Sequence, residues 1–333
     1  MASASRILVI KHSALGDVVL AVAAFQAIRR HHPGARITLL TTAPYVALGR
    51  ASGLFDAVWT DPRAPLWKPG AWWPLLRALR GARFDMVYDL QRSQRTAWYF
   101  HALGPRRPCW NGTARGASHR VHGMAARRHI ADRVAAQLAK AGIREVRESD
   151  LSFLDADTTR FGLSPPFALL VPGGAAHRPE KRWPAANFGE LARYLQDAGL
   201  TPVILGTAGE ADVAAAIREA CPRARDLTGC TDFAELAALG RKAACAVGND
   251  TGPMHLLAAA GCPSVALFGP ASDPVKVAPR GPWVAVCQGT PLDALSVDAV
   301  RAALPPFGAA GPALASAPAA SHVQGGATAR PNR

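Results

Sequence analysis

Short apolar runs rich in Val, Ile and Leu alternate along this chain with stretches of helical periodicity. Residues 6–11 form such a run, residues 18–30 follow with helical spacing, and residues 35–40 form the next run. A continuous β-branched run is typical of a parallel strand buried on both faces, and strand alternating with helix indicates a parallel sheet covered on both sides. The pattern predicts an α/β fold. Further strands are expected at 84–90, 167–171, 201–205, 243–247 and 264–268. Further helices are expected at 72–80, from Ser93 onward, and at 128–141, 184–198, 210–220, 232–239 and 252–260.

The alternation begins again near the middle of the chain, after a Pro-containing stretch at 161–166 that reads as a linker. Two successive halves of roughly 150 residues predict two doubly wound, Rossmann-like domains that face each other across a cleft. The first domain is expected at 1–158 and the second at 159–304. The segment 305–333, rich in Ala, Pro, Gly and Ser, predicts a disordered tail, and the irregular, basic segment 103–124 predicts a surface loop.

The charge of the chain is positive and unevenly placed. Lys and Arg number 38 against 24 Asp and Glu, which gives a formal net charge of +14. Residues 1–155 hold 23 of the basic and 10 of the acidic side chains, whereas residues 156–333 hold 15 and 14. An anionic partner is therefore expected, which leaves nucleic acid, an anionic lipid surface and a phosphorylated small molecule open.

Cysteine usage and hydropathy favour a cytoplasmic protein. The six cysteines include no Cys-x-x-Cys pair and no cluster suited to a metal or a disulfide scaffold, so reduced thiols are expected. No apolar run reaches the roughly 18 residues that cross a bilayer. Asp17 interrupts the apolar N-terminal stretch, which therefore reads as strand, loop and helix rather than as a signal peptide.

The segment 243–255 predicts an anion site. It reads as a strand that leads through a turn with Gly248 and Gly252 into a helix. Glycine lets the backbone approach a ligand closely, and the free amides and dipole of a helix start favour negative charge, which suits a phosphate or pyrophosphate. In the alternative interpretation, Asn249 and Asp250 merely cap that helix.

A second loop that follows a predicted strand carries positive charge. Gly173 and Gly174 offer bare backbone, and His177 and Lys181 offer cations at the same end of the sheet. The alternative is a solvated basic loop. Two such loops in one half, both after strands, favour a shared phosphate site.

Two acidic residues stand where a doubly wound fold carries its chemistry. Asp17 follows the first strand and could act as a general base, or it could cap the following helix. Glu210 follows the strand at 201–205 and could accept hydrogen bonds from a ribose diol, or it could be a first-turn acid favoured by the helix dipole. The first strand is followed by no G-x-G-x-x-G, and the chain has no Walker loop, which disfavours dinucleotide dehydrogenases and P-loop ATPases.

Four motifs occur in order along the chain. They are Leu-Gly-Asp ending at Asp17, Asp-Leu-Gln at 89–91, Lys-Arg-Trp-Pro at 181–184, and Asp-Thr-Gly at 250–252 followed by His255. Together they resemble glycosyltransferase family 9, the heptosyltransferase family, over most of the chain. The resemblance implies a GT-B fold with an N-terminal acceptor domain and a C-terminal nucleotide-sugar domain. It also implies transfer with inversion at the anomeric carbon and without a metal ion.

The resemblance implies the substrates as well. The family's usual donor is ADP-L-glycero-D-manno-heptose, and its acceptor is the inner core of lipopolysaccharide at the cytoplasmic face of the inner membrane. We therefore expect an ADP-sugar donor, a phosphorylated glycolipid acceptor of the lipid A–core type, and peripheral contact with the anionic membrane face. No metal, cofactor or nucleic acid is expected.

Matching positions carry the family's functional residues onto this chain. The resemblance implies that Asp17 is the base, Lys181 the phosphate-binding lysine, Glu210 the ribose-binding acid and Asp250 a donor-sugar contact. Other expected donor-binding residues are Thr251 and Gly252 in a pyrophosphate turn, Thr231 in an adenine-side loop, and Gly174, His177 and His255. The segment before Lys181 lacks a hydroxyl pair that some members of the family have.

Three alternatives stay open at this point. The chain could use another nucleotide sugar or acceptor within the family. A GT-B-like sugar-nucleotide epimerase or hydrolase would form product from the donor alone, and a nucleic-acid-binding protein would use the basic first half. For a transferase, we expect acceptor phosphates or carboxylates to meet four arginines of that half, namely Arg92, Arg95, Arg115 and Arg120.

Overall fold

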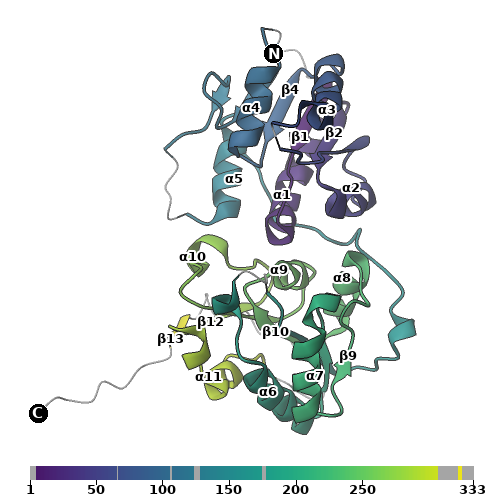
Figure 1. The fold of residues 1–333 in the computed structure, drawn as a ribbon, viewed down its shortest axis with the longest axis vertical. Helices are drawn as coiled ribbons and strands as arrows, with labels where there is room; N and C mark the ends of the chain where they lie inside the picture. The colour runs from purple at the N-terminus through teal and green to yellow at the C-terminus, as the bar shows by residue number, and fades with distance from the viewer. Residues whose placement is uncertain are drawn as a thin grey trace, which may run out of the picture. The chain divides into compact units, whose positions relative to one another are not determined.

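The structure is a computed structural model that describes residues 5–65, 67–105, 107–123, 128–174, 178–306 and 322–324. The chain divides into two compact units, Met1–Leu154 and Asp155–Arg333, called unit 1 and unit 2 below. The sequence pattern predicts this division at 158/159. Phe161, at the start of the stretch that reads as a linker, is buried within unit 2. Each unit is a sheet with helices of its own (Figure 1).

Unit 1 is built on a parallel sheet with the strand order β3-β2-β1-β4-β5-β6. The chain starts in the centre with β1, adds strands toward one edge, and then returns to add strands on the other side of β1. This is the order of a Rossmann-type sheet, and its direction changes between β1 and β4. The strands are β1 (Arg6–Ile10), β2 (Arg36–Thr41), β3 (Ala57–Thr60), β4 (Met86–Asp89), β5 (Cys109–Gly112) and β6 (His119–Arg120).

Helices cover both faces of this sheet. Leu8 and Ile10 of β1 share one core cluster with Leu79 of α3 and Tyr99 of α4, so these two helices lie on one face. Right-handed crossovers in the two directions place their helices on opposite faces, so α1 covers the other face, where it packs against α5. The helices are α1 (Leu15–His31), α2 (Val46–Ala51), α3 (Pro69–Gly81), α4 (Gln94–Ala102) and α5 (Ile130–Ala139).

Two strands lie where the sequence reads as a loop. Within 103–124, β5 pairs with β4, and β6 pairs with β5. Trp110 of β5 is fully buried and packs edge-on against Phe100, with 5.3 Å between the ring centroids. The prediction of a surface loop is therefore wrong for these residues. The four-residue strand includes Asn and Gly, which have little intrinsic β propensity, so pairing with β4 and burial of Trp110 decide its conformation.

Unit 2 repeats the plan with a seven-stranded parallel sheet in the order β13-β12-β11-β10-β7-β8-β9. Its first strand, β7, is again internal, and the direction changes between β7 and β10. The strands are β7 (Phe167–Val171), β8 (Thr201–Ile204), β9 (Arg225–Asp226), β10 (Cys245–Asn249), β11 (Ser264–Phe268), β12 (Val284–Gln288) and β13 (His322–Gln324). The helices are α6 (Ala185–Asp197), α7 (Ala211–Ala220), α8 (Phe233–Lys242), α9 (Gly252–Ala259), α10 (Pro274–Val277) and α11 (Val297–Ala302).

One edge of the unit 2 sheet reaches into the segment expected to be a tail. Of 305–333, the structure describes residues 305–306 and β13, which pairs in parallel with β12. The other residues of that segment lie outside the described ranges. Within those ranges, no helix is both long enough and apolar enough to cross a lipid bilayer.

Candidate active site

In unit 1, Asp17 lies at the edge of the sheet where β1 and β4 end. Ile10 of β1 is paired with Asp89 of β4, so the residues that follow the two strands emerge side by side. Asp17 is in the first turn of α1, and its Oδ2 lies 3.7 Å from the Nζ of Lys11. Ligands of doubly wound folds bind outside the carboxyl ends of the strands at such a change of direction, so this is a suitable position for a reacting group.

Asp17 does not cap α1. The helix begins at Leu15, and the cap position belongs to Ala14, whose side chain makes no cap hydrogen bond. The alternative interpretation of Asp17 as an N-cap is therefore wrong. The Asp17 side chain is 37% exposed, whereas the Lys11 side chain behind it is only 6% exposed. A carboxylate that is open to solvent and held by a buried ammonium can receive a proton from a substrate.

The charges around Asp17 form a cluster of alternating sign. Burial lowers the pKa of the Lys11 ammonium, the charge of Asp17 opposes that shift, and Arg92 adds to it. Arg92 is half-buried and has a positive φ of 53°, and its backbone N–H donates to Oδ1 of Asp89 at 2.9 Å. This left-handed turn after β4 brings the Arg92 charge into the neighbourhood of Lys11 and Asp17.

Asp89 is the buried end of this cluster. It is fully buried, and its Oδ2 has no hydrogen-bond partner among the residues that the structure describes. Burial raises the pKa of Asp89 to about 6, although hydrogen bonds from Arg92, Thr96 and Gln91 lower it in part. Such perturbed carboxyl groups concentrate at functional sites, and this one lies at the end of the strand that neighbours β1.

Replacing Asp89 by Asn is expected to remove a pH dependence of stability. The raised pKa means that the folded chain binds a proton which the unfolded chain has released between about pH 4 and 6, so the free energy of unfolding falls as the pH rises through that window, by about 3 kcal/mol. The Asn carbonyl oxygen can still accept the Arg92 N–H. Urea unfolding at several pH values should therefore show the wild type losing stability relative to Asp89→Asn as the pH rises. Parallel curves for the two proteins would contradict the assignment.

The four arginines expected at the acceptor have different environments. Arg95 is tied to its own unit, because its guanidinium donates to the Tyr99 hydroxyl at 3.2 Å and to the Ala64 carbonyl at 2.6 Å. Arg92 belongs to the cluster around Asp17. Arg115 and Arg120 are exposed on the β5–β6 segment, and no hydrogen bond or ion pair within the described ranges joins them to the other two. The structure thus brings only Arg92 next to the candidate base.

In unit 2, a buried asparagine joins the two loops that were expected to bind phosphate. Asn249 ends β10, and its Nδ2 donates to the carbonyls of Pro172 at 2.7 Å and Gly173 at 3.1 Å, after β7. Its Oδ1 accepts the backbone N–H of Trp183 at 3.0 Å. The interpretation of Asn249 as a helix cap is therefore wrong, because its side chain fixes the neighbouring loop at the change of direction between β7 and β10. Its place at the end of an apolar strand was the only sequence signal for this role.

Lys181 and Asp250 meet through this arrangement. Trp183 is almost completely buried, and its indole N–H donates to the carbonyl of Leu295 at 2.9 Å, so the Lys-Arg-Trp-Pro loop is anchored two residues after Lys181. The Nζ of Lys181 then lies 2.8 Å from Oδ2 of Asp250, and the two side chains are 18% and 10% exposed. A mostly buried ammonium with a single carboxylate partner retains donors for an anionic ligand.

The start of α9 lies next to this ion pair. Thr251 is at the N-cap position but makes no side-chain cap bond, because its hydroxyl donates to the carbonyl of Asn249 at 3.1 Å. The backbone N–H groups of Gly252 and Met254 in the first turn of α9 therefore have no side-chain cap, Pro253 has no N–H, and His255 is buried one turn along. Gly248 has a different role from the expected one. A Cβ there would lie 2.6 Å from Cβ of Val171, so that glycine permits close packing of β10 on β7 rather than approach of a ligand.

Glu210 lies over the glycine loop after β7. Its Oε2 accepts the backbone N–H of Thr207 at 2.7 Å, in a capping box of the one-turn 3-10 helix Ala208–Glu210 that precedes α7. These local contacts agree with the alternative interpretation of Glu210 as an acid in the first turn of a helix. The same side chain lies against Gly173, where a Cβ would be 2.9 Å from Cδ of Glu210. Glu210 therefore belongs to the same cluster as Asn249.

Three further residues were expected in the donor site, namely Gly174, Thr231 and His177. Gly174 accepts a hydrogen bond from Arg182, which covers the loop. Thr231 is half-buried in the loop before α8, where Asp232 caps the helix by accepting the N–H of Glu235 at 2.8 Å. His177 lies outside the described residues. In the described ranges, no group of three or more His, Cys, Asp and Glu side chains is arranged to hold a metal ion.

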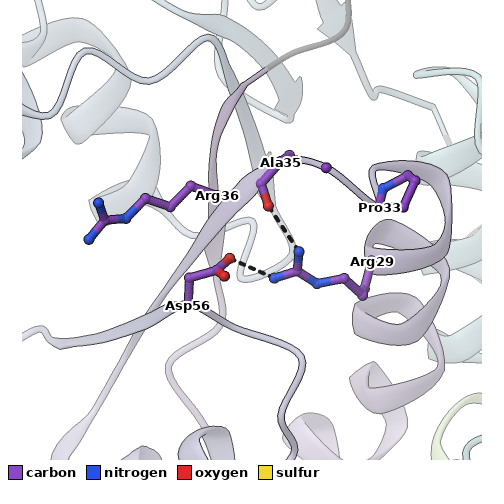
Figure 2. Close-up of a pocket in the computed structure, with 6 residues that line it drawn as sticks. Arg29, Pro33, Ala35, Arg36 and Asp56 are labelled. Atoms are coloured by element: carbon purple, nitrogen blue, oxygen red, sulfur yellow. Dashed lines mark hydrogen bonds and ion pairs between the residues drawn. The ribbon is translucent and has the colours of Figure 1, made fainter.

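A cavity of about 450 Å³ lies at a different place in unit 1, at the amino ends of β2 and β3 (Figure 2). Arg29 crosses it and is paired with Asp56 at 2.7 Å, and it also donates to the Ala35 carbonyl at 2.9 Å. These contacts satisfy the guanidinium from within the protein. The cavity contains none of the expected site residues and lies at the edge of the sheet opposite to Asp17.

Comparison with known proteins agrees with this architecture. The model of a family described as glycosyltransferase family 9 (heptosyltransferase) matches residues 72–295. The lipopolysaccharide heptosyltransferase 2 of Escherichia coli (strain K12) is 29% identical over 294 residues, which cover 80% of this chain and 83% of that protein.

Two solved structures share the fold. The family 9 glycosyltransferase from Veillonella parvula DSM 2008 matches with a TM-score of 0.77 and 22% identity, over 90% of this chain and 95% of that one. The E. coli ADP-heptose lps heptosyltransferase II matches with a TM-score of 0.73 and 25% identity, over 89% of this chain and 96% of that one. With the family model matching more than half of its residues, the chain belongs to glycosyltransferase family 9, the heptosyltransferase family, and is a glycosyltransferase with a GT-B fold.

Proposed function

We propose that this protein transfers a heptose from ADP-heptose to the inner core of lipopolysaccharide, with inversion at the anomeric carbon and without a metal ion. The observation that carries the proposal is the Lys181–Asp250 pair beside the start of α9, held by Asn249 at the change of strand direction in unit 2. The heptose and the lipopolysaccharide rest on the names of the similar proteins from E. coli.

On the donor side, the proposal uses the positive groups of unit 2. As the bond between the anomeric carbon and the diphosphate breaks, negative charge grows on the ADP leaving group. The Lys181 ammonium and the first-turn amides of α9 would stabilise that charge, which is the work that a metal ion does in other enzymes. Asp250 would orient Lys181 and contact the donor sugar, and Glu210 would bind the ribose hydroxyls.

On the acceptor side, the proposal assigns Asp17 as the general base. The acceptor hydroxyl oxygen forms the new bond to the anomeric carbon, its proton passes to the Asp17 carboxylate, and ADP leaves with the bonding electrons. Lys11 holds that carboxylate from behind while leaving it accessible to solvent. Arg92 would supply a cation for an acceptor phosphate or carboxylate next to the base.

The proposed location is the cytoplasm, with peripheral attachment to an anionic membrane where the glycolipid acceptor resides. Residues 1–155 hold 23 basic against 10 acidic side chains, so unit 1 carries nearly all of the excess positive charge. Such a field attracts phosphorylated lipids and the anionic leaflet that contains them.

The direct test incubates the purified protein with several nucleotide sugars and with lipid A–Kdo acceptors of different length, and reads the products by mass spectrometry. We expect one heptose to be added from ADP-heptose, only when the acceptor is present, and at an unchanged rate in excess EDTA. Product from the donor alone would indicate an epimerase or hydrolase instead. Loss of activity in EDTA that returns with Mg²⁺ or Mn²⁺ would contradict the metal-free mechanism, and preference for another nucleotide sugar would contradict the assigned donor.

A further inference from the structure

One helix of unit 1 presents large aromatic side chains to solvent. Trp67, just before α3, is 80% exposed, and Trp73 within α3 is 50% exposed. Tryptophan has a large apolar surface that folding normally buries at least in part, so two such side chains close in sequence are unusual. Residues of this kind indicate a surface that another molecule covers.

The core of unit 1 does not require these tryptophans. α3 already buries Leu75, Leu76 and Leu79 against the sheet, which gives the helix a complete apolar face. Trp73 and Arg77 are four residues apart and Arg80 follows three residues later, so these side chains form one stripe, which is exposed. We call this stripe, together with the exposed Trp67 and Lys68 that directly precede α3, the tryptophan face.

The tryptophan face is positively charged without compensation. From residue 67 to 84 the chain contains Lys68, Arg77, Arg80 and Arg83 and no Asp or Glu. All four cations are exposed, and in the described part of the chain none of them forms an ion pair. The Arg80 guanidinium lies 5.8 Å from the centre of the Trp73 ring. Exposed indoles among lysines and arginines are typical of surfaces that sit in the headgroup region of a bilayer.

The ring contacts of Trp73 favour lipid over a single-stranded nucleic acid. Arg80 lies over one face of the Trp73 ring and Trp72 meets that ring at 6.2 Å with an angle of 61° between the planes, so fewer positions remain at which a base could stack. Insertion among lipid headgroups needs exposed apolar area and nearby cations, and both remain available here.

We propose that the tryptophan face docks on an anionic lipid bilayer, with Trp67 and Trp73 inserted at the headgroup level and Lys68 and Arg77 bound to anionic headgroups. The inference deepens the proposed function and rests on it for the membrane at which the enzyme works. Its test needs neither the donor nor the acceptor. A failure of vesicle binding can therefore be distinguished from a failure of heptose transfer.

The experiment measures co-sedimentation of the full-length protein with vesicles of phosphatidylcholine that contain about a quarter of phosphatidylglycerol, and with phosphatidylcholine vesicles alone. We expect binding to the anionic vesicles at about 0.1 M salt that weakens as the salt concentration rises. Trp67→Ser combined with Trp73→Ser, and separately Lys68→Gln combined with Arg77→Gln, should each weaken that binding about tenfold or more. Both pairs of side chains are exposed, and circular dichroism should confirm that the variants fold.

A matched control removes the same number of positive charges from unit 2. Arg218→Gln combined with Arg223→Gln removes two exposed arginines and should leave vesicle binding within about twofold of the wild type. An equal loss in this control would show that only total charge matters and would overturn the proposal. Unchanged vesicle binding in the tryptophan variant would also overturn it. The proposal would likewise be overturned if the variant with Trp67→Ser and Trp73→Ser kept its binding to vesicles but lost affinity for single-stranded RNA or lost self-association.

Discussion

Replacing Asp17 by Asn is expected to lower kcat for heptose transfer by about 10²- to 10⁴-fold, the usual contribution of a positioned general base. The Asn side chain has nearly the same shape but cannot take the proton of the acceptor hydroxyl. The affinity for ADP should change less than twofold, because all the residues expected to bind the donor lie in unit 2, whereas Asp17 lies in unit 1. Steady-state kinetics of transfer and calorimetric titration with ADP measure the two quantities.

The matched control for Asp17 is Asp212, which is also an acid in the first turn of a helix but lies exposed at the start of α7. Asp212→Asn removes the same charge from the same helical position and should leave kcat within a factor of about two, because only the helix-dipole contribution is lost. A kcat for Asp17→Asn within tenfold of the wild type would show that another group accepts the proton. A parallel loss of ADP affinity would place Asp17 in donor binding instead.

Replacing Lys181 by Met is expected to lower kcat by about 10²- to 10³-fold, as removal of one stabilising donor of a developing anion does in other enzymes. It should also weaken ADP binding about tenfold, because a charge-assisted contact to the diphosphate is lost. Methionine keeps the length and apolar stem of lysine and removes only the ammonium. Transfer kinetics and titration with ADP again separate the two effects.

Lys181→Met also leaves the mostly buried Asp250 carboxylate without its ion-pair partner, which lowers stability. The double variant Lys181→Met with Asp250→Asn removes that charge and should recover stability without recovering kcat. The control is Lys242→Met, because Lys242 ends α8 before β10 begins, and its amine is bound to the Thr158 hydroxyl at 2.7 Å. Recovery of kcat in the double variant, or an equal loss in Lys242→Met, would mean that Lys181 acts only through stability.

The structure changes what can be expected of the basic residues in unit 1. Arg95 holds Ala64 and Tyr99 in place, so its substitution should disturb the unit itself. Arg92 remains a candidate for the acceptor because it lies beside Lys11 and Asp17. A further part of the positive charge lies on the tryptophan face, where it meets no acidic partner within the described residues. The positive charge of unit 1 is therefore shared among the candidate active site with Arg92, the internal contacts of Arg95, and the tryptophan face.

Strong periodic patterns allowed much of the fold to be predicted from the sequence. The buried run at β7 is apolar throughout, those at β1 and β11 are apolar after their first residue, and α6 has a clear apolar stripe, so their positions follow from local composition. β5 could not be predicted in the same way. β5 is short and contains Asn and Gly, and only pairing with a neighbour from a distant part of the chain makes it a strand.

The candidate residues were identifiable as chemical types because their motifs are local. Asp17, Lys181, Asp250 and Glu210 each lie between a strand and the body of the helix that follows it, and such positions are visible in a linear pattern. Their partners were not visible. The contact of Asn249 with Gly173 joins residues 76 positions apart, and the Lys181–Asp250 pair joins residues 69 apart.

The division between the two kinds of information follows from the range of the forces involved. Hydrophobic periodicity and helix starts are local, so the sequence was sufficient for the α/β class, for the two-part organisation and for the residue types that end the strands. Burial and hydrogen bonding depend on segments that meet only after folding. The tertiary structure alone therefore decided that Asp17 is a solvent-accessible carboxylate paired with a buried lysine. It also decided that Asn249 hydrogen-bonds to the neighbouring loop instead of capping a helix, and that two tryptophans of unit 1 remain on its surface.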